Sequence, residues 1–392
     1  MPVANAAVPA RTPGKAGDPG GRIPVAAPCM PASGAIAPYL RRIDESGWYS
    51  NFGPLINEFE ARLGARFPSG AKVVTVANGT LALTLILEAL QLPRGALCAV
   101  PSWTFVATAH AIRMAGLVPW FVDVDPENGE LTPSGLDAQL ALAPGPVAAA
   151  IPVAVMGRPV EAASWRAFQD ATGIRIVVDA AAGFDQVHAA PVPVMVSLHA
   201  TKAMGIGEGA FIATEDEALS LRFRAMTNFG FLGDRISRHV ATNAKLSEYA
   251  AAVGLAALDL WPCARGRYIA AAQNLRAHLR DETRVVFQSG WGLDWIPSTC
   301  VVTLPNGAAG HAEEVLAAAG VDTRRWWSTG CHKAPAFRDC PSAPLPVTEA
   351  LASSTLGLPF FAGLSGDEVQ TIASALRSSF PSRSPQPRGL VS

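Results

Sequence analysis

The chain has 392 residues, which at roughly 150 residues per domain suggests two domains, or one large α/β domain with an appendage. Hydrophobic residues make up 49% and charged residues only 16%, so the composition excludes both a disordered chain and a coiled coil. The formal net charge of −1 provides no basic surface for DNA or RNA, so we expect no nucleic-acid partner.

Two long uncharged stretches are poor candidates for a membrane span or a signal peptide. Residues 138–157 contain Pro144, Pro146 and Pro152, and residues 23–40 contain four prolines, which disrupt helices. We therefore expect a cytoplasmic protein that does not enter a membrane. The six cysteines are scattered without a CxxC pair, and the histidines lack zinc-site spacing, so we expect reduced thiols and no metal.

Both ends of the chain are expected to be mobile tails. Residues 1–31 are rich in Ala, Pro and Gly without any periodicity, and residues 381–392 contain the segment SRSPQPRG. The folded part of the chain is therefore expected to lie between residues 32 and 380.

From residue 72 onward, short β-branched strands alternate with helices. Strands are predicted at residues 72–76, 97–100, 118–122, 147–153, 174–178 and 194–198, and intervening helices include residues 80–90 and 160–171. This alternation predicts an α/β fold with a mainly parallel sheet between two layers of helices.

The pattern changes near Asn243. A long helix is expected over residues 244–275, with a break or kink at Pro262. Further elements are then expected, namely strands at residues 284–288 and 299–304 and helices at residues 312–319 and 367–378. We predict a large domain over residues 32–250 and a smaller α+β domain over residues 251–380.

Lys202 stands out among five lysines because it follows an apolar strand and precedes the glycine-rich segment from Gly205 to Gly209. A lysine held away from water has a lowered pKa and becomes an amine nucleophile that can form a Schiff base. The alternative is an ordinary surface lysine on a turn.

Asp179 ends a buried strand, where open α/β sheets place their ligands. A protonated pyridine nitrogen would give this buried carboxylate the partner that it needs. Alternatively, Asp179 caps the next helix or pairs with an arginine.

Three further segments follow strands and offer groups for a phosphate or a ring. The junction Asn78-Gly79-Thr80 opens a helix whose free amides form an anion site, although it is also a good helix cap. The Ser197 hydroxyl would bind the same phosphate or the local backbone. Trp103 and Phe105 would stack on a ring or pack in the core, and core packing suits Trp103 better.

In order and spacing, these segments resemble the DegT/StrS family of pyridoxal-phosphate-dependent sugar aminotransferases. The resemblance covers residues 43–376 and rests on motifs that include GWYS at 47–50, NGTLAL at 78–83, VPSWTFVAT at 100–108, VDAA at 178–181, SLHATK at 197–202, GEG at 207–209 and NAKLSE at 243–248. It implies fold type I of the pyridoxal-phosphate enzymes.

The resemblance also implies roles for residues around the cofactor. Lys202 would be the Schiff-base lysine and the proton shuttle, Asp179 would hold the pyridine nitrogen, and Phe105 would stack on the ring. The residues that would hold the phosphate are Gly79, Thr80 and Ser197.

Four more residues take roles from the same resemblance. Asn243 would reach the cofactor phosphate of the neighbouring subunit, which implies a homodimer with active sites at its interface. Arg324, Arg325 and His332 are candidate contacts for a substrate diphosphate or carboxylate, or else belong to a solvated face.

Two positions depart from the family pattern. Ala182 stands where many members have Gln or His, and Val178 stands where Glu is usual, so a less polar ring environment is expected. Some relatives carry His in place of the Schiff-base lysine and dehydrate their substrates. Because Lys202 is present, that branch is disfavoured.

The expected reaction is transamination in two half-reactions, with pyridoxamine phosphate as the intermediate cofactor form. The amino donor would be an amino acid, most often glutamate in this family, and the acceptor a keto-sugar nucleotide, which the resemblance favours as a dTDP-4-keto-6-deoxyhexose. An aminocyclitol or other keto substrate is the alternative. A non-catalytic pyridoxal-phosphate-binding regulatory protein is the alternative of another class.

Overall fold

The computed structural model describes residues 21–380. The expected C-terminal tail at residues 381–392 and most of the expected N-terminal tail therefore lie outside the described residues. Residues 21–31 are described, and they are fixed to the rest of the chain. Ile23 is buried and exchanges backbone hydrogen bonds with Gly320 and Asp322, and the Val25 carbonyl accepts the Phe360 N–H. The backbone at Ile23 and Val25 is thus paired with the smaller part of the molecule, and the mobility of the tails stays a prediction.

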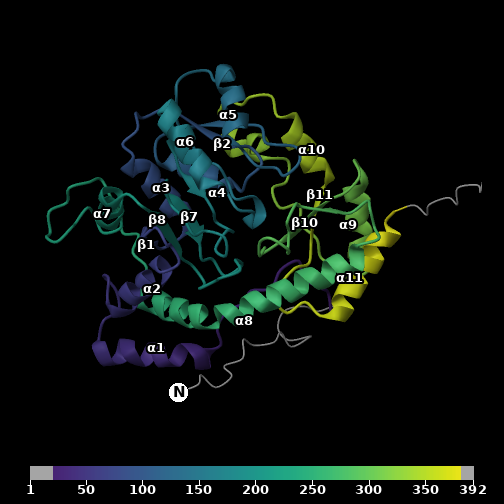
Figure 1. The fold of residues 1–392 in the computed structure, drawn as a ribbon, viewed down its shortest axis with the longest axis horizontal. Coiled ribbons are helices and arrows are strands. Elements are labelled where there is room, and N and C mark those ends of the chain that lie inside the picture. Colours follow the sequence, from purple (N-terminus) through teal and green to yellow (C-terminus); the bar gives the residue numbers. More distant parts are fainter. Residues whose placement is uncertain (1–20, 381–392) are drawn as a thin grey trace, which may run out of the picture.

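The centre of the fold is a mainly parallel sheet (Figure 1). One half has the order β1-β8-β7-β6 and the other β3-β2-β4-β5; only the pairs that involve β8 are antiparallel. The strands are β1 (Lys72–Val76), β2 (Leu97–Pro101), β3 (Val118–Val122), β4 (Val147–Ala150), β5 (Arg175–Ile176), β6 (Val178–Asp179), β7 (Val194–Ser197) and β8 (Ala210–Thr214). Hydrogen bonds from the Asp179 N–H to Pro152 and from the Ala154 N–H to Asp179 join the two halves into one sheet.

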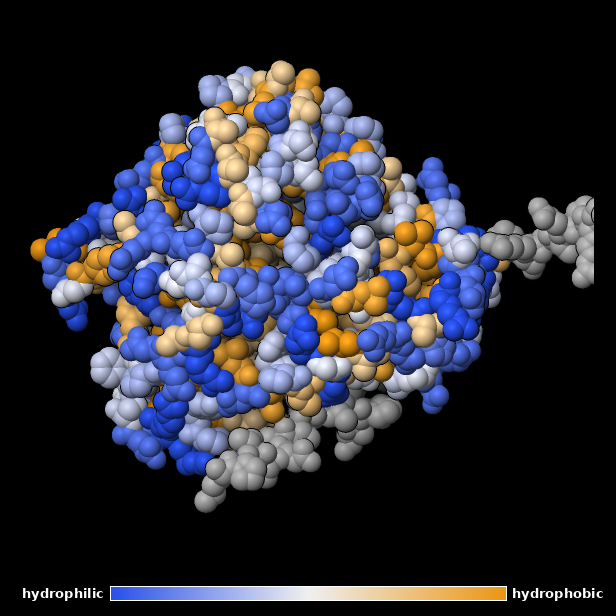
Figure 2. Space-filling view, viewed as in Figure 1, coloured by the Kyte–Doolittle hydropathy of each residue, from blue (hydrophilic) through white to orange (hydrophobic). Residues whose placement is uncertain are grey.

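Helices cover both faces of this sheet, as the alternation of strands and helices predicts. Side chains that alternate along the strands enter two separate cores. One core takes in α2 (Pro54–Gly64), α5 (Pro133–Gln139), α6 (Ala162–Thr172) and α8 (Glu248–Leu279), and the other α3 (Gly79–Ala89), α4 (Val106–Met114) and α7 (Glu217–Met226). Hydrophilic residues dominate the surface in Figure 2, where apolar residues form small separate groups.

The long helix α8 runs beneath the sheet and on to the smaller part of the molecule (Figure 1). It begins at Glu248 rather than near Ala244, because the Ser247 side chain accepts the Ala250 N–H and caps the helix there. The helix continues on both sides of Pro262. A second buried contact fixes its start, since Glu248 accepts the N–H groups of Leu55 and Ile56 at the beginning of α2.

The smaller part contains a three-stranded antiparallel sheet in the order β11-β10-β9. Its elements are β9 (Val286–Phe287), β10 (Cys300–Thr303), α9 (Ala308–Ala318), α10 (Pro346–Ser354), β11 (Thr355–Leu358) and α11 (Gly366–Ser378), while α1 (Ser33–Ser46) packs on α8. The expected boundary between residues 250 and 251 falls in the first turn of α8, and the domain limits stay a prediction.

One carboxylate ties the two parts together. Asp123, which follows β3, accepts the N–H groups of Val347 and Thr348 and the Thr348 hydroxyl, each at 2.8 Å. These groups belong to the first turn of α10, where the helix amides have no partners of their own. The Asp123 side chain therefore sets the position of α10 relative to the large sheet.

Three general properties follow from the described residues. No helix within residues 21–380 has the length and apolar character to cross a membrane. All six cysteines are unpaired, with Cys98, Cys300 and Cys331 buried. In the same range, no three His, Cys, Asp or Glu side chains are grouped as metal ligands.

Candidate active site

The candidate site lies at one edge of the sheet, where β1, β6 and β7 end. Asp179 pairs with Met195 in the parallel ladder, so the two side chains point to the same face, and Ser197 lies two residues further along that face. Because β1 runs in the same direction as β7, its end brings Asn78 and Gly79 to the same edge. Residues that are distant in the sequence thus meet at one place.

The beginning of α3 forms an anion site at this edge. Asn78 caps the helix by accepting the Leu81 N–H at 2.9 Å, and the N–H groups of Gly79 and Thr80 have no partner among residues 21–380. A Cβ atom at Gly79 would lie 3.1 Å from the Met195 sulfur and 3.5 Å from the Ser197 Cβ. Glycine therefore keeps open the space between the free amides and Ser197, where a phosphate would bind.

The Ser197 hydroxyl faces this space with its proton free to donate. Its oxygen accepts the His199 N–H at 3.3 Å, which leaves the O–H available to an anion. The His199 side chain is engaged elsewhere, because its Nδ1 lies 2.8 Å from the Thr201 hydroxyl.

A tight turn presents Lys202 at the end of β7. The Lys202 N–H donates to the His199 carbonyl at 2.9 Å, and the Ala200 N–H donates to Gly207 at 2.8 Å. A Cβ atom at Gly205 would lie only 2.9 Å from the Ala200 backbone, so this close approach requires glycine.

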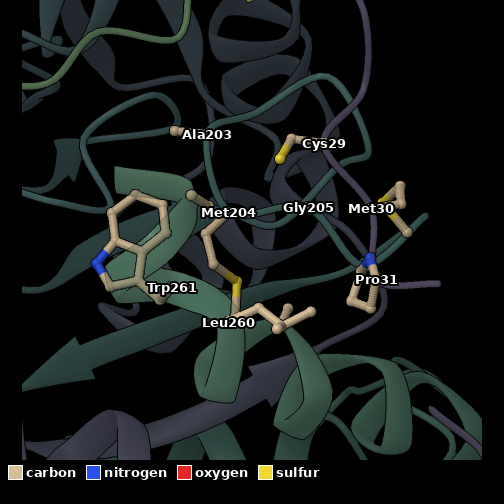
Figure 3. A pocket seen from close by; sticks show the side chains of 10 residues that line it. Cys29, Met30, Pro31, Ala203, Met204, Gly205, Leu260 and Trp261 are labelled. Atoms are coloured by element: carbon tan, nitrogen blue, oxygen red, sulfur yellow. The ribbon is translucent and has the colours of Figure 1, made fainter. Parts of the chain in front are cut away.

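The residues after Lys202 are packed between α8 and the N-terminal segment. Figure 3 shows Met204 reaching toward Leu260 and Trp261 of α8, with Cys29 to Pro31 on the other side. The cavity among these side chains has a volume of about 10 Å³, the lower limit for a single water molecule. The packing of residues 203–205 against α8 and the N-terminal segment therefore supports the turn that carries Lys202. The cavity within this packing is too small for a ligand.

The electrostatic surroundings suit Lys202 to a nucleophilic role. Burial lowers the pKa of the Lys202 amine, and the carboxylate of Asp179 opposes that change. Among residues 21–380, no hydrogen bond or ion pair engages the amine. A larger fraction of Lys202 is therefore uncharged near neutral pH than of an exposed lysine.

Asp179 is buried and held by two hydrogen bonds. Its Oδ1 accepts the Ala181 N–H at 3.0 Å, and its Oδ2 accepts the Thr108 hydroxyl at 2.8 Å. Burial raises the pKa of Asp179, against the lowering effects of Thr108, the Ala181 N–H and Lys202. No arginine pairs with this carboxylate in the described part of the chain, so it is suited to a cationic ligand.

The two aromatic candidates have different surroundings. Phe105 is the N-cap residue of α4 and is 60% exposed, so its ring is free to stack on a planar ligand. Trp103 is buried and packs edge-on against Trp327 of the smaller part at a centroid distance of 5.2 Å. Trp103 is therefore a core residue.

Thr108 also belongs to this site, although its place in the sequence predicts no role for it. It lies within the VPSWTFVAT motif, one helical turn after Phe105, but its contact with Asp179 joins segments 71 residues apart. The i, i+3 spacing from Phe105 is the only signal that could have indicated it.

Asn243 lies beside the anion site, and its side chain is exposed. The Ala77 N–H donates to the carbonyl of Ala244, and a backbone bridge joins Asn243 to Asn228. Asn243 ends a loop that extends outward after α7, at the left in Figure 1.

The three predicted substrate contacts are engaged with other groups. Arg325 pairs with Glu313 at 3.0 Å, and the exposed Arg324 lies over the Trp326 ring. The His332 Nδ1 lies 2.7 Å from the Ser102 hydroxyl, while its Nε2 is 3.7 Å from Glu349. Ser102 belongs to the same segment as Phe105, so His332 lies close to the end of β2. The substrate roles of the three residues stay predictions.

One of the two departures, Val178, lies away from the carboxylate of Asp179. Val178 is buried in the core on the opposite face of the sheet from Asp179, because successive strand residues alternate. Near Ala182, the backbone is closely packed: a Cβ atom at Gly157 would lie 2.8 Å from the Ala182 carbonyl oxygen.

These residues fit pyridoxal phosphate. Free amides and a hydroxyl suit its phosphate. The Lys202 amine and the buried Asp179 carboxylate, neither of which has an ion-pair partner within residues 21–380, suit its aldehyde and its protonated ring nitrogen. The exposed ring of Phe105 adds an apolar surface for the pyridine.

Comparisons with known proteins agree with this geometry. The model of the DegT/DnrJ/EryC1/StrS aminotransferase family matches residues 32–377. The erythromycin biosynthesis sensory transduction protein EryC1 of Saccharopolyspora erythraea is 33% identical over 86% of this chain and 93% of its own length.

Two solved structures have closely similar folds. DesI, solved in the presence of its TDP-sugar product, is 35% identical with a TM-score of 0.80, covering 90% of this chain and 91% of its own. A putative PLP-dependent aminotransferase from Bacillus cereus is 27% identical with a TM-score of 0.84, covering 91% of this chain and 100% of its own. The chain belongs to the DegT/DnrJ/EryC1/StrS aminotransferase family, has fold type I of the pyridoxal-phosphate enzymes, and is an aminotransferase.

Proposed function

We propose that this aminotransferase moves an amino group from L-glutamate to a keto-sugar nucleotide in the cytoplasm and gives an amino-deoxysugar nucleotide. Within that class, the proposed acceptor is a dTDP-4-keto-6-deoxyhexose. The observation that carries the proposal is the buried Lys202 amine. It has no hydrogen-bond or ion-pair partner among residues 21–380 and interacts electrostatically with the buried Asp179, which ends a strand at the same sheet edge as the free N-terminus of α3.

The chain's own residues supply the binding of pyridoxal phosphate. The amides of Gly79 and Thr80, with the hydroxyls of Thr80 and Ser197, would bind the phosphate dianion, and the α3 dipole adds to that attraction. Phe105 would pack against the pyridine ring. When bound, the cofactor supplies an electron-withdrawing ring that stabilises negative charge at the substrate carbon.

Lys202 would carry the proton transfers. Its uncharged amine is the group that would hold the cofactor by its aldehyde. As a free amine, it would accept a proton from the substrate α-carbon and return it one position away. Asp179 would keep the ring nitrogen protonated, because an anion close to that nitrogen favours its charged form.

The nucleotide-sugar acceptor is supported by DesI, which was solved with a TDP-sugar product and is 35% identical to this chain. EryC1, named a sensory transduction protein, favours a second candidate: a regulatory protein that binds pyridoxal phosphate without turnover. Both candidates require the cofactor, but only the enzyme requires Lys202 as a proton carrier.

We also propose a homodimer in which Asn243 reaches the phosphate of the neighbouring site. The loop before Asn243 exposes apolar side chains, with Phe229 at 47%, Ile236 at 61% and Val240 at 93% exposure. Such exposure is unusual for a free surface and suits a contact with a second copy.

The test uses the protein loaded with pyridoxal phosphate. On addition of L-glutamate, the visible absorbance of the bound cofactor should disappear, and it should return when the accepted keto-sugar nucleotide follows. Product masses from a panel of keto-sugar nucleotides and a keto-inositol identify the acceptor. An absorbance band unchanged by every amino acid supplied would contradict the enzyme and favour the regulatory protein.

A further inference from the structure

Asp179 is connected to two buried threonines that no step above uses. Thr108 and Thr104 are buried, as is Asp179. The Thr108 hydroxyl lies 2.8 Å from Asp179 Oδ2, and the hydroxyls of Thr104 and Thr108 are 3.0 Å apart. The three side chains form a continuous line that ends at the carboxylate.

The chemistry of the groups fixes the direction of these bonds. An ionised carboxylate only accepts, so Thr108 donates its hydroxyl proton to Asp179. The Thr108 oxygen is then an acceptor, and Thr104 donates to it. Each donation polarises the next hydroxyl, which strengthens the bond to the carboxylate.

A local alternative exists for the Thr108 proton. The Phe105 carbonyl lies 3.2 Å from the Thr108 hydroxyl, at the i−3 position of the same helix. The contact with Asp179 is shorter and has a charged acceptor, and such bonds are roughly twice as strong as neutral ones. The carboxylate is therefore the preferred acceptor while Asp179 is ionised.

The two carboxylate oxygens are held separately. Oδ1 is fixed by the Ala181 N–H and Oδ2 by Thr108, from different elements of the fold. Two anchors at opposite oxygens prevent rotation of the carboxylate plane, and each oxygen retains a lone pair for a ligand.

We propose that Thr108, supported by Thr104, is a positioning residue that orients the Asp179 carboxylate toward the protonated ring nitrogen of pyridoxal phosphate. This inference rests on the proposed function. It gives Thr108 and Thr104, within the TFVAT part of the motif, a role in tuning the cofactor, through Asp179 alone and without contact with the cofactor.

The test compares Thr108→Val, which keeps the shape but removes the hydroxyl, with Thr108→Ser, which keeps the hydroxyl. The Val variant should bind pyridoxal phosphate about tenfold more weakly, the effect of losing one bond to a charged group. The apparent pKa of the visible absorbance band should shift, because the ring nitrogen is less firmly protonated. The Ser variant should restore both quantities.

Kinetics and a matched control separate positioning from packing. With the cofactor saturating, Thr108→Val should lower kcat while the KM values change little, since the substrates do not touch this residue. The control is Thr355→Val, at a buried threonine of the smaller part whose hydroxyl donates to the Leu351 carbonyl and to no other group in the described part of the chain. It should leave cofactor affinity and the absorbance titration unchanged.

Two outcomes would overturn the inference. One is a Thr108→Val variant with the cofactor affinity and absorbance titration of the unmodified protein. The other applies if Thr108→Val does not fold and Thr104→Val is tested in its place. An absorbance titration of Thr104→Val equal to that of the unmodified protein would then overturn the inference. Failure of the proposed function is recognised separately, because the unmodified protein would then show no turnover with glutamate.

Discussion

The buried carboxylate of Asp179 is a functional group that destabilises the fold around it. Burial raises its pKa, so the folded cofactor-free protein holds this proton more tightly than the unfolded chain does. Protonation of this carboxyl therefore stabilises the folded state at pH values below 3.8, the usual pKa of an aspartate. That stabilisation is lost as the pH rises from 3.8 toward the raised pKa of the folded protein. Sites built for a charged ligand commonly show this conflict between stability and activity.

We predict that Asp179→Asn makes the cofactor-free protein more stable and abolishes turnover. Its melting temperature should exceed that of the unmodified protein by several degrees near neutral pH, and the difference should disappear near pH 3. The matched control is Asp185→Asn, which removes a buried partner of Arg265 at 2.8 Å and should lower the melting temperature. A lower melting temperature for both variants at neutral pH would contradict this account.

Single residues also show what the sequence can and cannot predict about the site. Lys202, Asp179 and Gly79 were identifiable, because each stands at a strand end with a local pattern that suits its chemistry. The Thr108 contact was not, because it depends on how α4 is placed against β6. The contact of Arg325 with Glu313 and that of His332 with Ser102 could not be predicted from the sequence, because they too depend on how elements pack against one another.

Among the elements, α10 depends on a residue of the other part of the molecule. Asp123 accepts three hydrogen bonds from its first turn, all at 2.8 Å. Asp123→Asn would place an amide against these donors, and we expect it to lower the stability of the folded state by about 2–3 kcal/mol. Chemical denaturation followed by circular dichroism measures this loss.

The control for Asp123 is Asp170→Asn, on the exposed surface of α6. Asp170 pairs with Arg166 at 2.9 Å, and exposed i, i+4 pairs contribute only about 0.3–0.5 kcal/mol. If the two variants lose equal stability, Asp123 has no special role in holding α10.

Strands were predicted more closely than helix ends. The limits of β1 and β3 agree with the predicted residues 72–76 and 118–122, because these strand-forming runs end close to Asn78 in one case and at Asp123 in the other. The helix α8 was predicted to begin at residue 244 and begins at Glu248. The Ser247 cap and the bond from the Ala77 N–H to the Ala244 carbonyl hold the preceding residues outside the helix. Such interactions across the fold cannot be read from periodicity.

At the level of the whole molecule, shared active sites can be tested by mixing inactive variants. In a dimer of Lys202→Ala and Asn243→Ala chains, one site would combine an intact Lys202 with an intact Asn243 from the other chain. Random exchange makes half of the dimers mixed, with one working site in two, so activity should recover to about a quarter of the unmodified level. Activity no greater than the sum of the separate variants would contradict the shared site.

The overall architecture was predictable for a physical reason that does not extend to the substrate. Alternating strands and helices admit few topologies, and both faces of a parallel sheet must be covered. The choice of acceptor substrate depends instead on the positions of individual side chains around the site. Arg324 lies over the Trp326 ring and Arg325 pairs with Glu313, and the pattern of the sequence predicts neither contact.

The bond between Lys202 and pyridoxal phosphate is the claim on which the account depends. Borohydride reduction of the loaded protein, digestion and mass spectrometry locate that bond among the five lysines of the chain. We predict the added cofactor mass on the peptide that contains Lys202, and no added mass in Lys202→Ala. Cofactor attached at another lysine, or absent from the unmodified protein, would contradict the account.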